Sequence, residues 1–143
     1  MASKTLFEKT IEIQAPPERV WAVMRDVERW AEWTASISSI KIVGAAPLGV
    51  GSFLLIRQPK LIPAKWRVTQ WEEGKGFVSI NATPGLSVTA KHWIEPTNSG
   101  SHVMLSIQFE GLLAPLVAGI FANLNERYLT LESQGLKRRS EEN

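Results

Sequence analysis

Two histidines are the residues of this sequence best suited to proton transfer, because imidazole changes charge near neutral pH. His92 alternates with three apolar residues in the strand-like run 88–94, so its side chain is expected to share their buried face. His102 falls on the polar parity of the last strand-like run and is expected to face outward. The alternation therefore predicts one interior imidazole and one surface imidazole.

Other polar side chains on neighbouring runs could lie beside His92. Trp66 and Gln70 share a face with Val68, which predicts a buried indole and a buried amide next to each other. Both faces of the run that holds Arg57 are partly apolar, so this guanidinium either enters the interior or lies at its rim. In the run that holds Asn81, Phe77 and Val78 point to opposite faces and both are apolar, so the direction of Asn81 stays open.

The elements that hold these residues follow from the hydrophobic period. Residues 5–15 alternate as an antiparallel strand with one wet face, and the Pro-Pro pair after them begins a short helix. Asp26, the only aspartate of the sequence, separates this helix from a second short one and is a candidate for the N-cap of the second. From residue 37 to 110, five or six short apolar runs are separated by tight turn signals, which predicts a meander of hairpins.

The C-terminal part changes to a helical period from Leu112 toward Arg139. Pro115 fits the first turn, where its missing N–H has no partner to lose. One long helix is predicted, with a core-facing stripe formed by Leu113, Leu116, Val117, Ile120, Leu124, Tyr128 and Leu131. A helix of this length laid across a curved sheet leaves a concavity that it cannot fill, and such a gap is a usual form of small-molecule site.

Composition excludes several other classes of protein. The 143 residues are 44% hydrophobic and 21% charged, which indicates one globular domain over residues 1–143. A net charge of +2 gives little support to nucleic-acid binding. No run approaches the roughly 20 apolar residues of a membrane span, so stable membrane insertion is not expected, and the cytoplasm is the expected compartment. With no cysteine and two histidines of opposite facing, neither a metal nor a cofactor is predicted.

Several phrases of the sequence carry a family resemblance. The stretch IEIQAPPERVWAVMRDVERWAEW resembles the N-terminal signature of the polyketide cyclase/dehydrase group within the START-like (SRPBCC) superfamily. The phrases PK..P..W.V at 59–68, HWIEPT at 92–97, FEGLLAPL at 109–116 and LESQGLKRR at 131–139 are similar to the same group, so the likeness spans essentially the whole chain. It implies an α+β helix-grip fold: a curved antiparallel sheet of six to seven strands wrapped around a long C-terminal helix, with two short helices after strand one and a hydrophobic cavity inside.

Three functions are compatible with the resemblance and the residues. The preferred hypothesis is binding of a small hydrophobic molecule (lipid-like, aromatic or polyketide-like) by a monomer or homodimer. The alternative is a cyclase in which Arg57 binds an enolate or carboxylate, His92 moves protons, and the walls are formed by Trp66, Phe109, Phe121 and Tyr128. The third is a protein-interaction module without a small ligand. The loop 59–63, with two aliphatic residues between prolines, could be a lid, a membrane contact, a dimer contact or ordinary packing.

Overall fold

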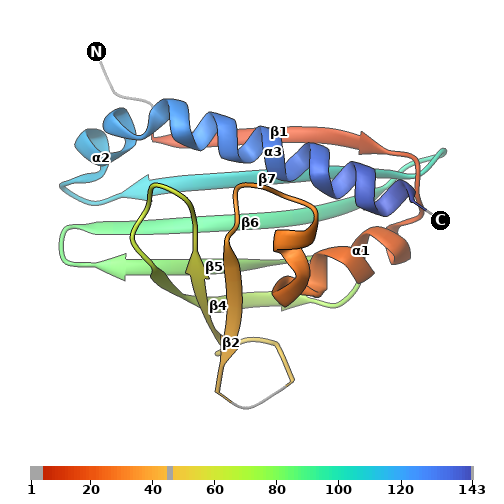
Figure 1. Ribbon diagram of the computed structural model, residues 1–143, viewed down its shortest axis with the longest axis horizontal. Helices are drawn as coiled ribbons and strands as arrows, with labels where there is room; N and C mark the ends of the chain where they lie inside the picture. Colours follow the sequence, from red (N-terminus) through yellow and green to blue (C-terminus); the bar gives the residue numbers. More distant parts are fainter. Residues whose placement is uncertain (1–4, 45–46, 143) are drawn as a thin grey trace.

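The computed structural model describes residues 5–44 and 47–142, which form a seven-stranded antiparallel sheet (Figure 1). The strands are β1 (Leu6–Ile13), β2 (Ser39–Val43), β3 (Phe53–Arg57), β4 (Ala64–Glu72), β5 (Gly76–Thr83), β6 (Leu86–Pro96) and β7 (Ser101–Glu110). Their order across the sheet is β1-β7-β6-β5-β4-β3-β2. The predicted meander is confirmed for β2 to β7, and β1 is the edge strand that pairs with β7.

The connection from β1 to β2 contains the two predicted short helical segments. The helix α1 (Pro17–Arg25) begins with proline in its first turn, and the second segment, η1 (Val27–Glu32), is a 3₁₀ helix. Asp26 occupies the N-cap position of η1, as predicted, but its carboxylate makes no capping hydrogen bond and lies 3.6 Å from Arg29 Nε. Its backbone carbonyl instead accepts the first hydrogen bond of η1, from Arg29 N at 3.0 Å.

The C-terminal segment is helical as predicted, but it is divided into α2 (Ala114–Ile120) and α3 (Ala122–Glu141) at Phe121. The predicted core stripe is also wrong. The buried residues of the two helices are Ala114, Ala118, Asn125, Leu129, Ser133, Gly135, Leu136 and Ser140. Small residues let the helices approach their neighbours closely, so most of the large aliphatic side chains of α2 turn outward.

The sheet is strongly curved, and the helices lie on its inner face. In Figure 1, β2 crosses the direction of β5, β6 and β7, while α3 runs along β1 and β7. The register between β4 and β5 shifts between Val68 and Gln70, which marks a β-bulge, and bulges bend a strand and increase its twist. The segment η1 packs on β2, and α1 packs on α3, so the inner face is enclosed from two sides. Within the described residues, no helix is both long enough and apolar enough to cross a bilayer.

Candidate ligand site

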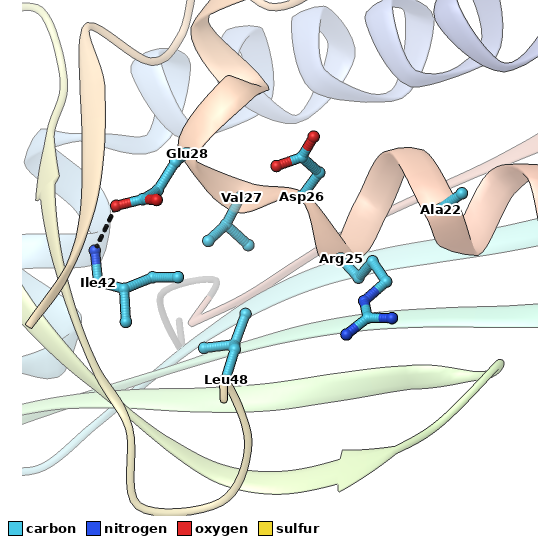
Figure 2. A pocket seen from close by; sticks show the side chains of 7 residues that line it. All are labelled: Ala22, Arg25, Asp26, Val27, Glu28, Ile42 and Leu48. Atoms are coloured by element: carbon cyan, nitrogen blue, oxygen red, sulfur yellow. Dashed lines mark hydrogen bonds between the residues drawn. The ribbon is translucent and has the colours of Figure 1, made fainter. Parts of the chain in front are cut away.

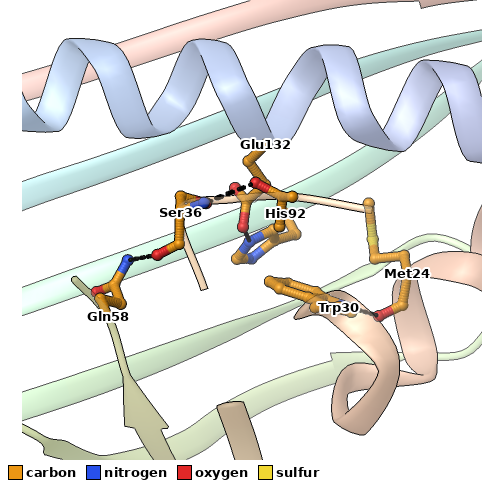
Figure 3. A network of polar contacts seen from close by, with 7 residues as sticks. Met24, Trp30, Ser36, Gln58, His92 and Glu132 are labelled. Carbon is orange, nitrogen blue, oxygen red and sulfur yellow. Dashed lines mark hydrogen bonds and ion pairs between the residues drawn. The ribbon is translucent and has the colours of Figure 1, made fainter. Parts of the chain in front are cut away.

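His92 occupies the inner face of β6, as predicted, and belongs to a cluster of aromatic rings. The imidazole stacks on Phe77 with ring centroids 4.9 Å apart. The indole of Trp30 lies 5.0 Å from the imidazole, measured between ring centroids (Figure 3). His92 Nε2 lies 3.4 Å from Glu132 Oε1 on α3. An imidazole and a carboxylate therefore meet in a mostly apolar environment, where a proton could be held or passed on.

The local sequence explains why these groups meet. His92 and Phe77 are directly opposite each other in the β5–β6 pairing, so their rings share one face of the sheet. Trp30 is fixed by a hydrogen bond that its Nε1 donates to Met24 O at 2.9 Å. The side chain of Glu132 is only 13% exposed, and it comes from the face of α3 that is turned to the sheet.

Three buried nitrogen atoms have no hydrogen-bond partner within the described part of the chain: Trp66 Nε1, His92 Nδ1 and Asn125 Nδ2. The three residues are 8–9% exposed and lie on inward faces of β4, β6 and α3. An indole N–H and an amide N–H can only donate, whereas a neutral imidazole nitrogen can also accept. Burying such groups without a partner costs about 1–3 kcal/mol each, so a partner from outside the chain would stabilise them.

Part of this inner face can be reached by solvent. Ala90 lies between the buried residues Val88 and His92 on the inner parity of β6, yet it is only partly buried. Its partner Ile107 in β7 is likewise partly buried, although Leu105 and Phe109 on the same face are buried. The middle of the sheet's inner face, at Ala90 and Ile107, is therefore accessible to solvent, although the residues before and after it on the same face of both strands are buried.

The predicted inward direction of Gln70 is wrong, because this residue is exposed. Trp66 and Val68 are buried as predicted, but the bulge before Gln70 adds one residue to β4 and reverses the alternation beyond it. The apolar residues Trp66, Val68 and Trp71 change parity across the bulge, and this change was the available signal in the sequence.

The structure also shows the directions of Arg57 and Asn81, which the sequence left open. Arg57 at the end of β3 is exposed, while Leu54 on the other face of this strand is buried. Asn81 is half-buried, and its Nδ2 donates to Lys65 O at 2.9 Å across the strand pair. Among the described residues, neither a hydrogen bond nor an ion pair joins Arg57 or Asn81 to His92.

Besides the buried Trp66, the three other aromatic residues expected as walls have different environments. Phe109 is buried and packs edge-on against Phe7, with ring centroids 6.0 Å apart. Phe121 is half-buried at the junction of α2 and α3. The Tyr128 hydroxyl donates a hydrogen bond to Pro59 O, which ties the β3–β4 loop to α3, and partial burial raises the pKa of Tyr128 above 10.0.

Two hollows of the described residues lie beside α1 and η1, and neither lies between the sheet and the terminal helix, where a large hollow was expected. The larger one, of about 390 Å³, lies beside α1 and η1 and is lined by Ala22, Arg25, Asp26, Val27, Glu28, Ile42 and Leu48 (Figure 2). The second, of about 130 Å³, is lined by Arg19, Ala22, Val23, Asp26, Arg29, Trp33 and Arg139. None of the predicted ligand residues lines either hollow.

Two residues of the candidate site were not found by sequence reasoning. Glu132 belongs to α3, 40 positions after His92, and nothing in the local pattern pairs the two. Asn125 lies four residues before Leu129, on the same buried face of α3. A polar residue at helical spacing from a core leucine was the available signal in the sequence. In the described ranges, no group of three or more His, Asp or Glu side chains converges as a metal site.

Comparison with known proteins agrees with this architecture. Residues 4–141 match the family model described as polyketide cyclase / dehydrase and lipid transport. The chain belongs to this family. No curated protein matches the sequence. Membership in the polyketide cyclase/dehydrase and lipid transport family confirms the resemblance carried by the N-terminal signature.

Solved structures share the helix-grip fold of the family at low sequence identity. A START superfamily protein from Mycobacterium smegmatis is 17% identical, with a TM-score of 0.78 over 96% of this chain and 98% of the other. A hypothetical protein from Helicobacter pylori is 13% identical, with a TM-score of 0.79 over 96% and 89%. The di-domain ARO/CYC StfQ from the steffimycin biosynthetic pathway is 12% identical, with a TM-score of 0.73 over 96% of this chain and 50% of that one. At these identities the likeness is one of fold alone.

Proposed function

We propose that this protein binds a small hydrophobic molecule against the inner face of the sheet, beneath α3. The observation that carries the proposal is the set of three unpartnered nitrogen atoms on His92, Trp66 and Asn125, each nine-tenths buried. The partly exposed Ala90 and Ile107 give such a molecule an apolar surface to contact. Most of the affinity would come from apolar burial, at about 25 cal/mol per Å².

The test uses the chain's own tryptophans. Quenching of tryptophan fluorescence is titrated with fatty acids, quinones, sterols and aromatic polyketides, and saturable binding of one molecule per chain is expected. Trp66→Phe should weaken binding of an oxygen-bearing ligand about fivefold, the equivalent of one hydrogen bond of about 1 kcal/mol. Trp93→Phe is the matched control, because Trp93 is on the outer parity of β6 and its Nε1 donates to Glu95 at 3.0 Å. Equal losses in both variants would refute the site, and no binding by any compound would favour a protein-interaction role.

A second candidate function is a cyclase-like reaction, favoured by the His92–Glu132 contact of 3.4 Å. In this mechanism Glu132 orients the imidazole, and His92 takes up or releases a proton of a bound poly-keto chain. The exposed Arg57 takes no part in it. His92→Phe should abolish product formation, while binding should weaken only about fivefold, as expected for one lost hydrogen bond of about 1 kcal/mol, whereas Arg57→Ala should change neither. Product formed at an unchanged rate by His92→Phe would remove this function.

A further inference from the structure

The helix α2 has its large and small side chains in the reverse of the usual arrangement. Ala114 and Ala118 face β7 and are buried, whereas Leu116 and Ile120, one turn apart on the opposite side, are 61% and 67% exposed. Leu112, four residues before Leu116, is 95% exposed. We call Leu112, Leu113, Leu116 and Ile120 the α2 patch. Packing within the chain leaves Leu112, Leu116 and Ile120 mostly in water and Leu113 45% exposed, so it does not explain the size of these side chains.

The α2 patch lies at one end of the molecule, where β7 ends and α3 begins (Figure 1). Residues 111–125 contain no charged side chain, and they are bracketed by Glu110 and Glu126. The N-terminal side of the patch is held in place, because Leu113 N donates to Gly85 O at 2.9 Å. The α2 patch is therefore an uncharged apolar surface at one end of the molecule, and a backbone hydrogen bond fixes its position.

We propose that the α2 patch docks on the surface of a phospholipid bilayer. The residue types of the α2 patch favour a bilayer over a protein partner. Protein interfaces rely on Trp, Tyr and Arg anchors and on hydrogen bonds, and the patch offers only Leu and Ile. Lipid acyl chains need no hydrogen bond and accept any aliphatic side chain. A short apolar segment that lies in the interfacial region fits residues 111–125, since they do not form a membrane-spanning helix.

The size of the patch also disfavours a second copy of the chain. Four leucine-sized side chains bury at most about 500 Å², whereas a stable interface buries about 800 Å² per partner. A bilayer needs no such continuous area, because each aliphatic side chain that enters the acyl region contributes by itself. Docking is independent of the proposed ligand site, which lies on the inner face of the sheet.

Since the patch carries no charge, its binding should depend little on anionic lipid or on salt. The test is flotation of the purified protein with phosphatidylcholine vesicles, with and without anionic lipid, at low and high salt. Wild-type protein should float under all four conditions. The triple variant Leu112→Ser/Leu116→Ser/Ile120→Ser should lose at least tenfold in bound fraction. The matched control is Val43→Ser/Val50→Ser, which changes one exposed aliphatic residue at the end of β2 and one in the connection between β2 and β3, and it should bind like wild type.

A second measurement stays valid if the triple variant fails to fold. The chain has no cysteine, so Leu116→Cys and Val50→Cys can each carry a single nitrobenzoxadiazole fluorophore. Leu116 and Val50 are similarly exposed, at 61% and 65%. Vesicles should raise and blue-shift the emission at position 116 and leave position 50 unchanged. Unchanged emission at 116, flotation only with anionic lipid at low salt, or a dimer that the triple variant dissociates would each overturn the proposal.

Discussion

The imidazole of His92 and the carboxylate of Glu132 are separated by 40 residues in the chain and lie 3.4 Å apart between β6 and α3. This contact uses one imidazole nitrogen, Nε2, and leaves Nδ1 buried without a partner among the described residues. The two nitrogens of His92 are therefore in different environments: one faces a carboxylate on α3, and the other is free for a bound molecule.

The contact predicts the tautomer of His92. An ionised Glu132 can only accept, so the neutral imidazole should carry its proton on Nε2 and present a lone pair at Nδ1. Long-range ¹H–¹⁵N correlation spectra at neutral pH measure this tautomer directly. In Glu132→Gln the preference should weaken, because an amide can either donate or accept. A wild-type spectrum with the proton on Nδ1 would contradict the arrangement.

Replacing Asn125 should improve stability and harm binding. Asn125→Leu removes an unpartnered buried amide, so the free energy of unfolding should rise by about 1–2 kcal/mol in the absence of ligand. Binding of an oxygen-bearing ligand should weaken in the same variant. Asn123→Leu is the matched control, because Asn123 is exposed, and it should shift stability by less than about 0.5 kcal/mol. Urea denaturation measures both, and a destabilised Asn125→Leu would show that the amide has a partner.

Gly135 controls how closely α3 approaches η1. A Cβ at this position would lie 2.0 Å from the carbonyl oxygen of Trp33, which also accepts a hydrogen bond from Arg138 Nη2 at 2.9 Å. Gly135→Ala should therefore cost about 1–3 kcal/mol of stability. At Gly119 in α2 the same substitution meets no atom within 4 Å and should be neutral or stabilising by about 0.5–1 kcal/mol. Thermal unfolding of the two variants compares them, and equal effects would refute the close contact.

Glu73 accepts hydrogen bonds from two indoles and makes the stability of the fold depend on pH in the acidic range. Its carboxylate accepts hydrogen bonds from Trp21 Nε1 at 3.0 Å and Trp71 Nε1 at 2.8 Å, and Arg25 lies 3.3 Å away. The hydrogen bond from Trp21, then that from Trp71 and the charge of Arg25, lower the pKa of Glu73 below its usual value of 4.5. A lowered pKa in the folded state stabilises the fold above pH 4.5, and this contribution is lost as the pH falls through the lowered value.

The variant Glu73→Gln isolates this effect. It should be less stable than wild type at pH 7, and the difference should shrink below pH 4.5, where the wild-type carboxyl also becomes neutral. Urea denaturation at pH 7 and at pH 3 measures the two differences. Glu72→Gln is the neighbouring control, because Glu72 is exposed on β4. A difference that stays constant across the two pH values would assign the effect to packing rather than charge.

Local alternation was enough to predict several features of this protein. Strand side chains alternate with a period of two, so the inward direction of His92 and Trp66 and the outward direction of His102 could be inferred from their neighbours. Short turn signals between apolar runs were enough for the antiparallel meander, because such turns connect adjacent strands. The N-terminal signature was enough for the family.

Other features depend on contacts between distant segments, and only the tertiary structure decided them. The bulge before Gln70 adds one residue to β4 that a strict period of two does not include, and it turns this side chain outward. The approach of α3 to the sheet selects small residues, which brings Asn125 inward and leaves Leu116 in water. The pairing of His92 with Glu132 depends on how a helix docks on a sheet 40 residues away, and a one-dimensional pattern carries no information about that distance.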